Sequence, residues 1–186
     1  LGIVAIHDQD TDHVWAELTW SPDTKQWYRV LPGTPFISNE GKEFDYDWGC
    51  IYTAANPIFR EDEIRIFYGA SDGLHTGWRN GFLCLATLRP DGFAGYSAGK
   101  ELASITTRPV FTGEQFKVSA DIQKDGELTV RLLNDDRTIV CESQVFTESV
   151  TDECIVWQTE KDLYELKNGR LQFVFRKATI YSFCSQ

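Results

Sequence analysis

The 186-residue sequence contains no methionine and no long apolar run. Because an initiator methionine is missing, we expect a processed product or a piece of a longer protein. No apolar segment approaches the roughly 20 residues that a membrane span needs, and the apolar residues 1–6 are too few for a signal peptide. The sequence therefore predicts a soluble chain with no membrane partner.

Basic residues and metal-binding motifs are also scarce. The chain carries 18 Lys and Arg against 28 Asp and Glu, a formal net charge of −10. This charge repels polyphosphates, so nucleic acid is not an expected partner. The five cysteines form no CxxC pair, and His7 and His13 have no third ligand at suitable spacing, so no metal or cofactor is expected. Cys141 and Cys154 either form a disulfide or are buried thiols.

The chain is rich in aromatic side chains, which make up 13% of its residues within a hydrophobic fraction of 42%. This composition is sufficient for a buried core. Five of the six Trp and all three His precede residue 99. The change in composition near Gly99 predicts two domains, residues 1–98 and 99–186.

Short runs of β-branched and aromatic residues recur along the chain, whereas helical periodicity is hard to find, so we predict an all-β fold. Turn residues such as Asp125-Gly126 and Asn168-Gly169 separate these runs. The predicted strands cover residues 3–7, 14–20, 27–30, 51–55, 64–70, 82–88, 115–122, 128–133, 138–142, 154–157, 171–176 and 179–183.

The two halves differ in their apolar pattern. Leu128, Val130 and Leu132 alternate with polar residues, as do the apolar residues of 171–176, so these strands should bury one face. Strands with one buried face stack against a second sheet, which predicts a β-sandwich over residues 99–186. Residues 64–70 are more continuously apolar, which indicates strands covered on both faces, as in stacked propeller blades.

Three stretches of the first half resemble five-bladed β-propeller glycosidases. Residues 14–37 look like their blade with "Ser-x-Asp-Gly, x-Trp-x-Arg, Pro-Phe". Residues 44–58 are similar to the "Trp-Asp-x-Gly-x-Ile-Tyr" start of the next blade, and residues 66–93 resemble the "Tyr-Tyr-Gly-Gly-x-Asp-Gly" and "Gly-Leu-Ala-Thr-Leu-Arg-x-Asp-Gly-Phe" strands. Residues 105–109 and 178–183 look like the C-terminal β-sandwich attached to propellers of the invertase, levanase and arabinanase type.

This resemblance implies a partial five-bladed β-propeller of about two blades, followed by a C-terminal β-sandwich. The catalytic carboxylates of that superfamily lie on the first three blades, so we expect no catalytic residue here and no enzyme activity from this chain alone. Two blades cannot close a propeller, so an N-terminal segment, a partner chain or copies of this chain must cover the exposed flank. The resemblance favours an extracellular location, which the residues themselves leave open.

The best candidate for glycan binding is the segment 71–79, which combines an acid, an imidazole, an indole and a guanidinium: Asp72, His75, Trp78 and Arg79. A flat aromatic face beside polar groups suits the stacking and hydroxyl recognition of a sugar ring. Alternatively, Asp72-Gly73 is an ordinary turn and Trp78 seals a gap between blades.

Asp47 and Tyr68 complete the predicted glycan-binding set. Asp47 matches the aspartate of "Trp-Asp-x-Gly", with Tyr46 in place of the tryptophan, and the resemblance makes it a rim residue that contacts a sugar hydroxyl. The alternative is a turn-capping Asp in a solvated acidic loop. Tyr68 belongs to the strand that resembles "Tyr-Tyr-Gly-Gly".

Other conspicuous segments receive structural interpretations. Residues 8–13 begin like a calcium loop but lack its Gly and Glu, so they predict a solvated hairpin turn. The acidic residues 148–153 predict a solvated loop. Trp20 and Trp27 are expected to pack between blades.

Three functions follow from these observations. The first is a non-catalytic carbohydrate-binding or structural fragment of a propeller-type glycoside hydrolase-like protein. The second is the C-terminal part of an active glycoside hydrolase that an N-terminal segment completes. The third is an interaction or matrix protein that uses the fold without sugar chemistry.

Overall fold

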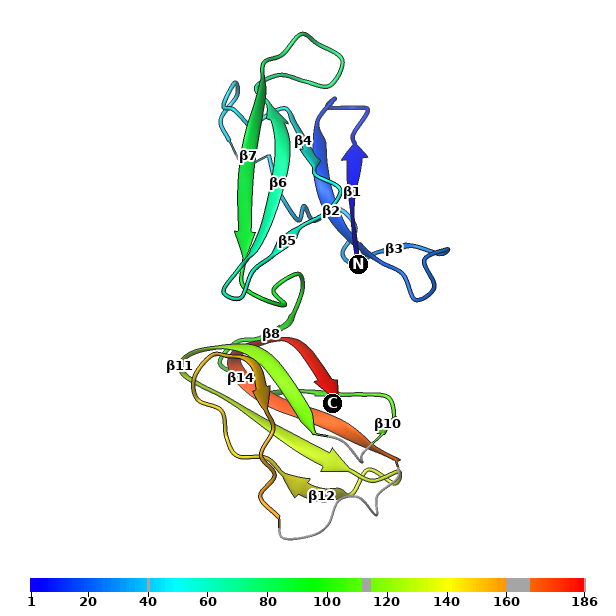
Figure 1. The fold of residues 1–186 in the computed structure, drawn as a ribbon, viewed down its shortest axis with the longest axis vertical. Helices are drawn as coiled ribbons and strands as arrows, with labels where there is room; N and C mark the ends of the chain where they lie inside the picture. The colour runs from blue at the N-terminus through cyan, green and yellow to red at the C-terminus, as the bar shows by residue number, and fades with distance from the viewer. Residues whose placement is uncertain (40, 112–114, 160–167, 186) are drawn as a thin grey trace. The chain divides into compact units, whose positions relative to one another are not determined.

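The computed structural model describes residues 1–39, 41–111, 115–159 and 168–185, and these residues form an all-β structure (Figure 1). They divide into two compact parts, Leu1–Pro90 (unit 1) and Asp91–Gln186 (unit 2). The division precedes the expected boundary at residue 99 because strand β8 (Tyr96–Ala98) pairs with a strand of unit 2. The described residues include no helix with the length and apolar character that crossing a membrane requires.

Unit 1 is one open sheet with the strand order β1-β2-β4-β6-β5, in which β3 also pairs with β2 and β7 with β6 (Figure 1). Its pairs are antiparallel except for the parallel contact of β2 with β4 at Val14 and Cys50. The strands are β1 (Gly2–His7), β2 (Val14–Trp20), β3 (Tyr28–Arg29), β4 (Cys50–Thr53), β5 (Ile58–Phe59), β6 (Ile64–Ser71) and β7 (Gly81–Leu88).

Strand β6 buries one face of unit 1 and leaves the other partly open. Ile64, Ile66 and Tyr68 are buried, whereas Gly69 is exposed. Because Gly69 pairs with Leu83 of β7, that leucine lies on the open face, where 82% of it is exposed. The expectation that residues 64–70 are covered on both faces is therefore wrong for this sheet.

Unit 2 is built on two long antiparallel strands, β11 (Phe116–Leu133) and β14 (Asn168–Ser185). The strand order is β10-β14-β11-β12, while β13 pairs with β11, and β8 and β9 pair with β14. The shorter strands are β8, β9 (Ala103–Thr106), β10 (Val110–Phe111), β12 (Ile139–Glu142) and β13 (Val150–Cys154).

The alternation predicted for unit 2 is confirmed. Leu128, Val130 and Leu132 are buried, and so are Leu171 and Phe173 on β14. Residues from both halves of β11 and of β14 belong to a single hydrophobic cluster. The long strand pair therefore encloses a core shared by its two halves.

The Asp125-Gly126 pair does not form the predicted turn between two strands. It lies inside β11, at an irregularity between Ile122 and Glu127 where the pairing with β14 shifts register. Asp125 and the opposing Lys177 both have positive φ, 61° and 45°. A Cβ on Gly126 would lie 2.5 Å from the Lys177 carbonyl oxygen, so this position needs glycine. The turn residues produce a bulge because β14 continues past them.

The acidic segment 148–153 is solvated as expected, because residues 148–149 and 151–153 are exposed, but its residues from Val150 onward form part of strand β13 rather than a loop. Its backbone pairs with the first half of β11, and Asp152 N donates to Ser119 Oγ at 2.9 Å. Cys154 lies opposite Lys117 and Cys141 opposite Leu132, at the two ends of β11. All five cysteines lie in the described residues, and none of them forms a disulfide there.

Candidate functional site

The structure distributes the six predicted glycan-binding residues over two places in unit 1. Asp72, His75, Trp78 and Arg79 lie in the connection between β6 and β7, residues 72–80, which we call the β6–β7 loop. The other two, Asp47 and Tyr68, line a cavity on the sheet.

Asp72 closes the base of the β6–β7 loop. Its Oδ1 accepts a hydrogen bond from Asn80 N at 2.8 Å, and its Oδ2 accepts one from Asn80 Nδ2 at 2.7 Å. These bonds hold the pKa of Asp72 below its usual value, so the side chain remains a carboxylate. Both carboxylate oxygens of Asp72 therefore accept hydrogen bonds within the loop.

Arg79 braces the loop from within. Its Nη1 donates to the carbonyl oxygens of Leu74 and Gly77, each at 3.2 Å, and to that of His75. Three carbonyls that converge on one guanidinium nitrogen fix the curve of the loop backbone. Arg79 thus shapes the candidate site.

Asp12, in the turn between β1 and β2, holds the β6–β7 loop from outside. Its Oδ2 accepts from Thr76 N at 2.9 Å and from Thr76 Oγ1 at 2.7 Å, while its Oδ1 lies 2.9 Å from His7 Nε2. The Thr76 bonds are the main reason that the pKa of Asp12 is lowered. Sequence reasoning missed this contact between Asp12 and Thr76, because no local motif indicates a hydrogen bond between residues 64 positions apart.

The turn that contains Asp12 is a closed hairpin turn, as predicted. Asp8 Oδ1 accepts from Asp10 N at 3.0 Å and Asp8 Oδ2 from Thr11 Oγ1 at 2.8 Å. These bonds occupy the carboxylate that a calcium loop would use first.

His75 is in contact with side chains on two sides. Its Nδ1 lies 2.7 Å from the Tyr52 hydroxyl, and the His7 ring lies 4.5 Å away between centroids. Burial raises the pKa of Tyr52, which keeps the phenol protonated. His75 therefore ties the loop to β4 and β1.

Trp78 is the member of the set that is open to a ligand, because 86% of it is exposed. The other tryptophans singled out are less open. Trp20 is 45% exposed and its ring lies 5.3 Å from that of Tyr28, and Trp27 is 49% exposed and lies over Gly2. Both are half-exposed rather than enclosed between layers, so the packing expected for them is not observed in the described residues.

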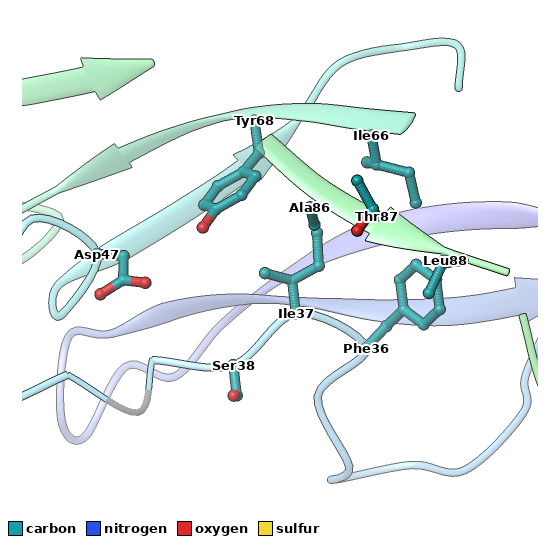
Figure 2. Close-up of a pocket in the computed structure, with 9 residues that line it drawn as sticks. All are labelled: Phe36, Ile37, Ser38, Asp47, Ile66, Tyr68, Ala86, Thr87 and Leu88. Atoms are coloured by element: carbon teal, nitrogen blue, oxygen red, sulfur yellow. The ribbon is translucent and has the colours of Figure 1, made fainter. Parts of the chain in front are cut away.

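The second place is a cavity of about 340 Å³ beside β6 and β7. Figure 2 shows the Asp47 carboxylate and the Tyr68 hydroxyl toward one end and the side chains of Phe36 and Leu88 toward the other. The lining residues are Phe36, Ile37, Ser38, Asp47, Ile66, Tyr68, Ala86, Thr87 and Leu88.

Hydroxyl groups accompany Asp47 at the polar end of the cavity. The charge of Asp47 is the main reason that the pKa of the nearby Tyr46, which is not among the lining residues, is raised. Burial is the main reason that the pKa of Tyr68 is raised, so both phenols remain protonated. Sequence reasoning did not single out Cys84, which lies opposite Tyr68. The β6–β7 register would have indicated Cys84.

Within the described part of the chain, no three His, Cys, Asp or Glu side chains are grouped so that they would hold a metal ion. Comparison of the chain with models of protein families, with curated proteins and with solved structures finds no match.

Proposed function

We propose that this chain is a non-catalytic, carbohydrate-binding part of a propeller-type glycosidase-like protein, with two blades in unit 1 and a β-sandwich in unit 2. The open sheet of unit 1 and the core that β11 and β14 share in unit 2 support this division. The residue we assign to sugar contact is Trp78, which is 86% exposed.

The observation that carries the proposal is the exposure of Trp78 on an anchored loop. The loop is closed by Asp72, braced by Arg79 and held by Asp12, so its backbone is ordered before any ligand arrives. A preorganised loop loses little conformational entropy on binding, and an indole face supplies a flat apolar surface for a sugar ring.

The electrostatics of Asp72 and Asp12 do not suit the general-acid role of a glycosidase. A glycosidase needs a general acid whose pKa is raised toward neutrality. Hydrogen bonds instead lower the pKa of Asp72 and of Asp12, so neither carboxylate holds a proton at neutral pH.

A glycan array that includes fructans and arabinans tests the proposal. We expect a bound glycan whose affinity falls by at least about tenfold in Trp78→Ala, because the stacking surface is lost. Trp20→Ala removes a half-exposed tryptophan elsewhere in unit 1 and should leave the affinity unchanged. An array without any bound glycan, equal losses in the two variants, or release of reducing sugar by the chain would contradict the proposal.

The exposed edge of β7 favours a second candidate function, namely that the chain binds another protein or a second copy of itself. The strand carries no charged residue over Gly81–Leu88, and among the described strands it pairs only with β6. Its Leu83 is 82% exposed and Leu85 is 46% exposed. Long, uncharged edge strands with exposed apolar side chains readily add a further strand.

Sedimentation velocity across a concentration series distinguishes this candidate. If β7 is an association edge, the chain forms larger species as its concentration rises, and Leu83→Lys suppresses them because a charged edge resists strand addition. Leu102→Lys places the same charge at a 62% exposed leucine outside the strands and should have no effect. A monomer at all concentrations would exclude self-association through β7.

A further inference from the structure

The cavity beside Tyr68 has the size and lining of a small-molecule site, separate from the exposed indole of Trp78. Its volume of about 340 Å³ lies at the lower end of the range of roughly 300–1,000 Å³ for ligand pockets. Its apolar wall consists of Phe36, Ile37, Ile66, Ala86 and Leu88.

Among the described residues that line this cavity, the polar end carries a negative charge and no cation. Of the nine residues that line it, Asp47 is the only charged one. The Tyr68 phenol lies toward the same end of the cavity and is neutral, because burial raises its pKa. The hydroxyl oxygens of Ser38 and Thr87 are further acceptors in the lining.

This arrangement favours a ligand with N–H donors and a positive charge at one end. An ammonium group near Asp47 would form a charge-assisted hydrogen bond, which is stronger than a neutral one. Aromatic rings such as that of Tyr68 also attract cations. The formal net charge of −10 raises the local concentration of small cations and lowers that of anions.

We propose that the cavity binds a small amphipathic ammonium compound, with the ammonium group at Asp47 and its apolar part against Phe36, Ile66 and Leu88. Figure 2 shows this polarity, with the carboxylate and the phenol toward one end and the apolar side chains toward the other. The proposal does not depend on glycan binding, because it uses a different set of contacts.

Titration with 2-phenylethylammonium, followed by amide chemical shifts of the full chain, tests this assignment. The neutral isostere 2-phenylethanol has the same ring and chain length but no charge. We expect saturable shifts at Ser38, Ala86 and Thr87, and an affinity for the ammonium about tenfold or more above that for the alcohol.

Two variants separate the role of Asp47 from a general effect of charge. Asp47→Asn removes the charge at nearly constant shape and should weaken ammonium binding by about tenfold, to the level of the alcohol. Glu43→Gln makes the same charge change at an exposed position four residues away and should alter the affinity by less than about twofold, as expected for screened surface charges.

If Asp47→Asn fails to fold, the salt dependence of the wild-type chain replaces it. Ammonium binding should weaken as ionic strength rises, and alcohol binding should not. Equal affinity for the ammonium and the alcohol, shifts confined to other parts of the chain, or no saturation by either probe would overturn the proposal.

Discussion

Glu17 carries a buried carboxylate. Removing its charge and removing its ion-pair partner should lower the free energy of unfolding by different amounts. Glu17 is 1% exposed, and its Oε1 accepts from Trp15 Nε1 at 2.9 Å and from Gly33 N at 3.0 Å. Arg29 Nε lies 2.8 Å from Oε2 as an ion pair without hydrogen-bond alignment. The carboxylate therefore depends on Arg29 for neutralisation, whereas Arg29, at 39% side-chain exposure, can be solvated alone.

We predict that Arg29→Met destabilises the chain more than Glu17→Gln does. The first change leaves a buried carboxylate unpaired, which costs about 3–5 kcal/mol. The second keeps an acceptor for Trp15 and Gly33 and costs about 1–2 kcal/mol. Urea unfolding of both variants measures the difference, and a larger loss in Glu17→Gln would contradict the argument.

Gly49 brings the start of β4 into close contact with the β6–β7 loop. A Cβ at this position would lie 1.8 Å from the carbonyl oxygen of Gly73, and Gly49 N donates to Ser71 O at 2.8 Å. Gly49→Ala should therefore cost about 1–3 kcal/mol through overpacking and shift the amide resonances of the loop. Gly77→Ala, where a Cβ meets nothing within 4 Å, should change the unfolding free energy by less than about 0.5 kcal/mol. Equal losses of unfolding free energy in Gly49→Ala and Gly77→Ala would contradict the close contact of Gly49 with the loop.

At the scale of elements, the β1–β2 turn and the β6–β7 loop are joined through a titratable group. Asp12 has a folded-state pKa below its ordinary value of 3.8, chiefly because Thr76 hydrogen-bonds to it. The stabilisation from such a group is present above pH 3.8 and is lost as the pH falls further toward the folded-state pKa.

We therefore predict that acid loosens the β6–β7 loop through Asp12. Hydrogen exchange at the amides of His75 and Thr76 should accelerate, relative to the intrinsic rate, as the pH falls below 3.8. In Asp12→Asn these amides should already be less protected at pH 7, and the acid-dependent change should be smaller. Asp10→Asn, in the same turn, should behave as the wild type. Identical protection in Asp12→Asn and the wild type would exclude the mechanism.

The elements that sequence patterns predicted are those whose signal is local. Alternating apolar residues in 128–132 and 171–175 indicated which face of β11 and β14 is buried, since each strand carries that pattern itself. Strands of two or three residues, such as β5 and β8, were missed because their pairing partners define them. Asp125-Gly126 has the chemistry of a turn, but β14 runs past it and makes it a bulge.

The same distinction holds for the candidate site. Asp72, His75, Trp78 and Arg79 were singled out together because they are adjacent in sequence, and the structure places them in one loop. Their individual roles depend on partners that only the fold supplies, such as Asp12, and no sequence spacing indicates that contact. The cavity is likewise non-local, since its lining comes from β6, β7 and the connection that precedes β4.

At the scale of the whole molecule, the two units have separate and unequal cores. The cluster of unit 2 buries large aromatic side chains, including Phe116, Phe146 and Phe175. The cluster of unit 1 centres on Ala16, Ile51, Tyr68 and Ala70. Since burial of apolar surface contributes about 25 cal/mol per Å², unit 2 has the larger stabilising term.

We predict that unit 1 unfolds at a lower urea concentration than unit 2. Five of the six tryptophans lie in unit 1, so in the variant Trp157→Phe indole fluorescence reports on that unit alone. The fluorescence transition should precede the later part of the far-ultraviolet circular dichroism transition, which follows the strands of both units. If the two transitions coincide across the urea range, the units unfold as one cooperative structure. The smaller core of unit 1 would then not make that unit unfold before unit 2.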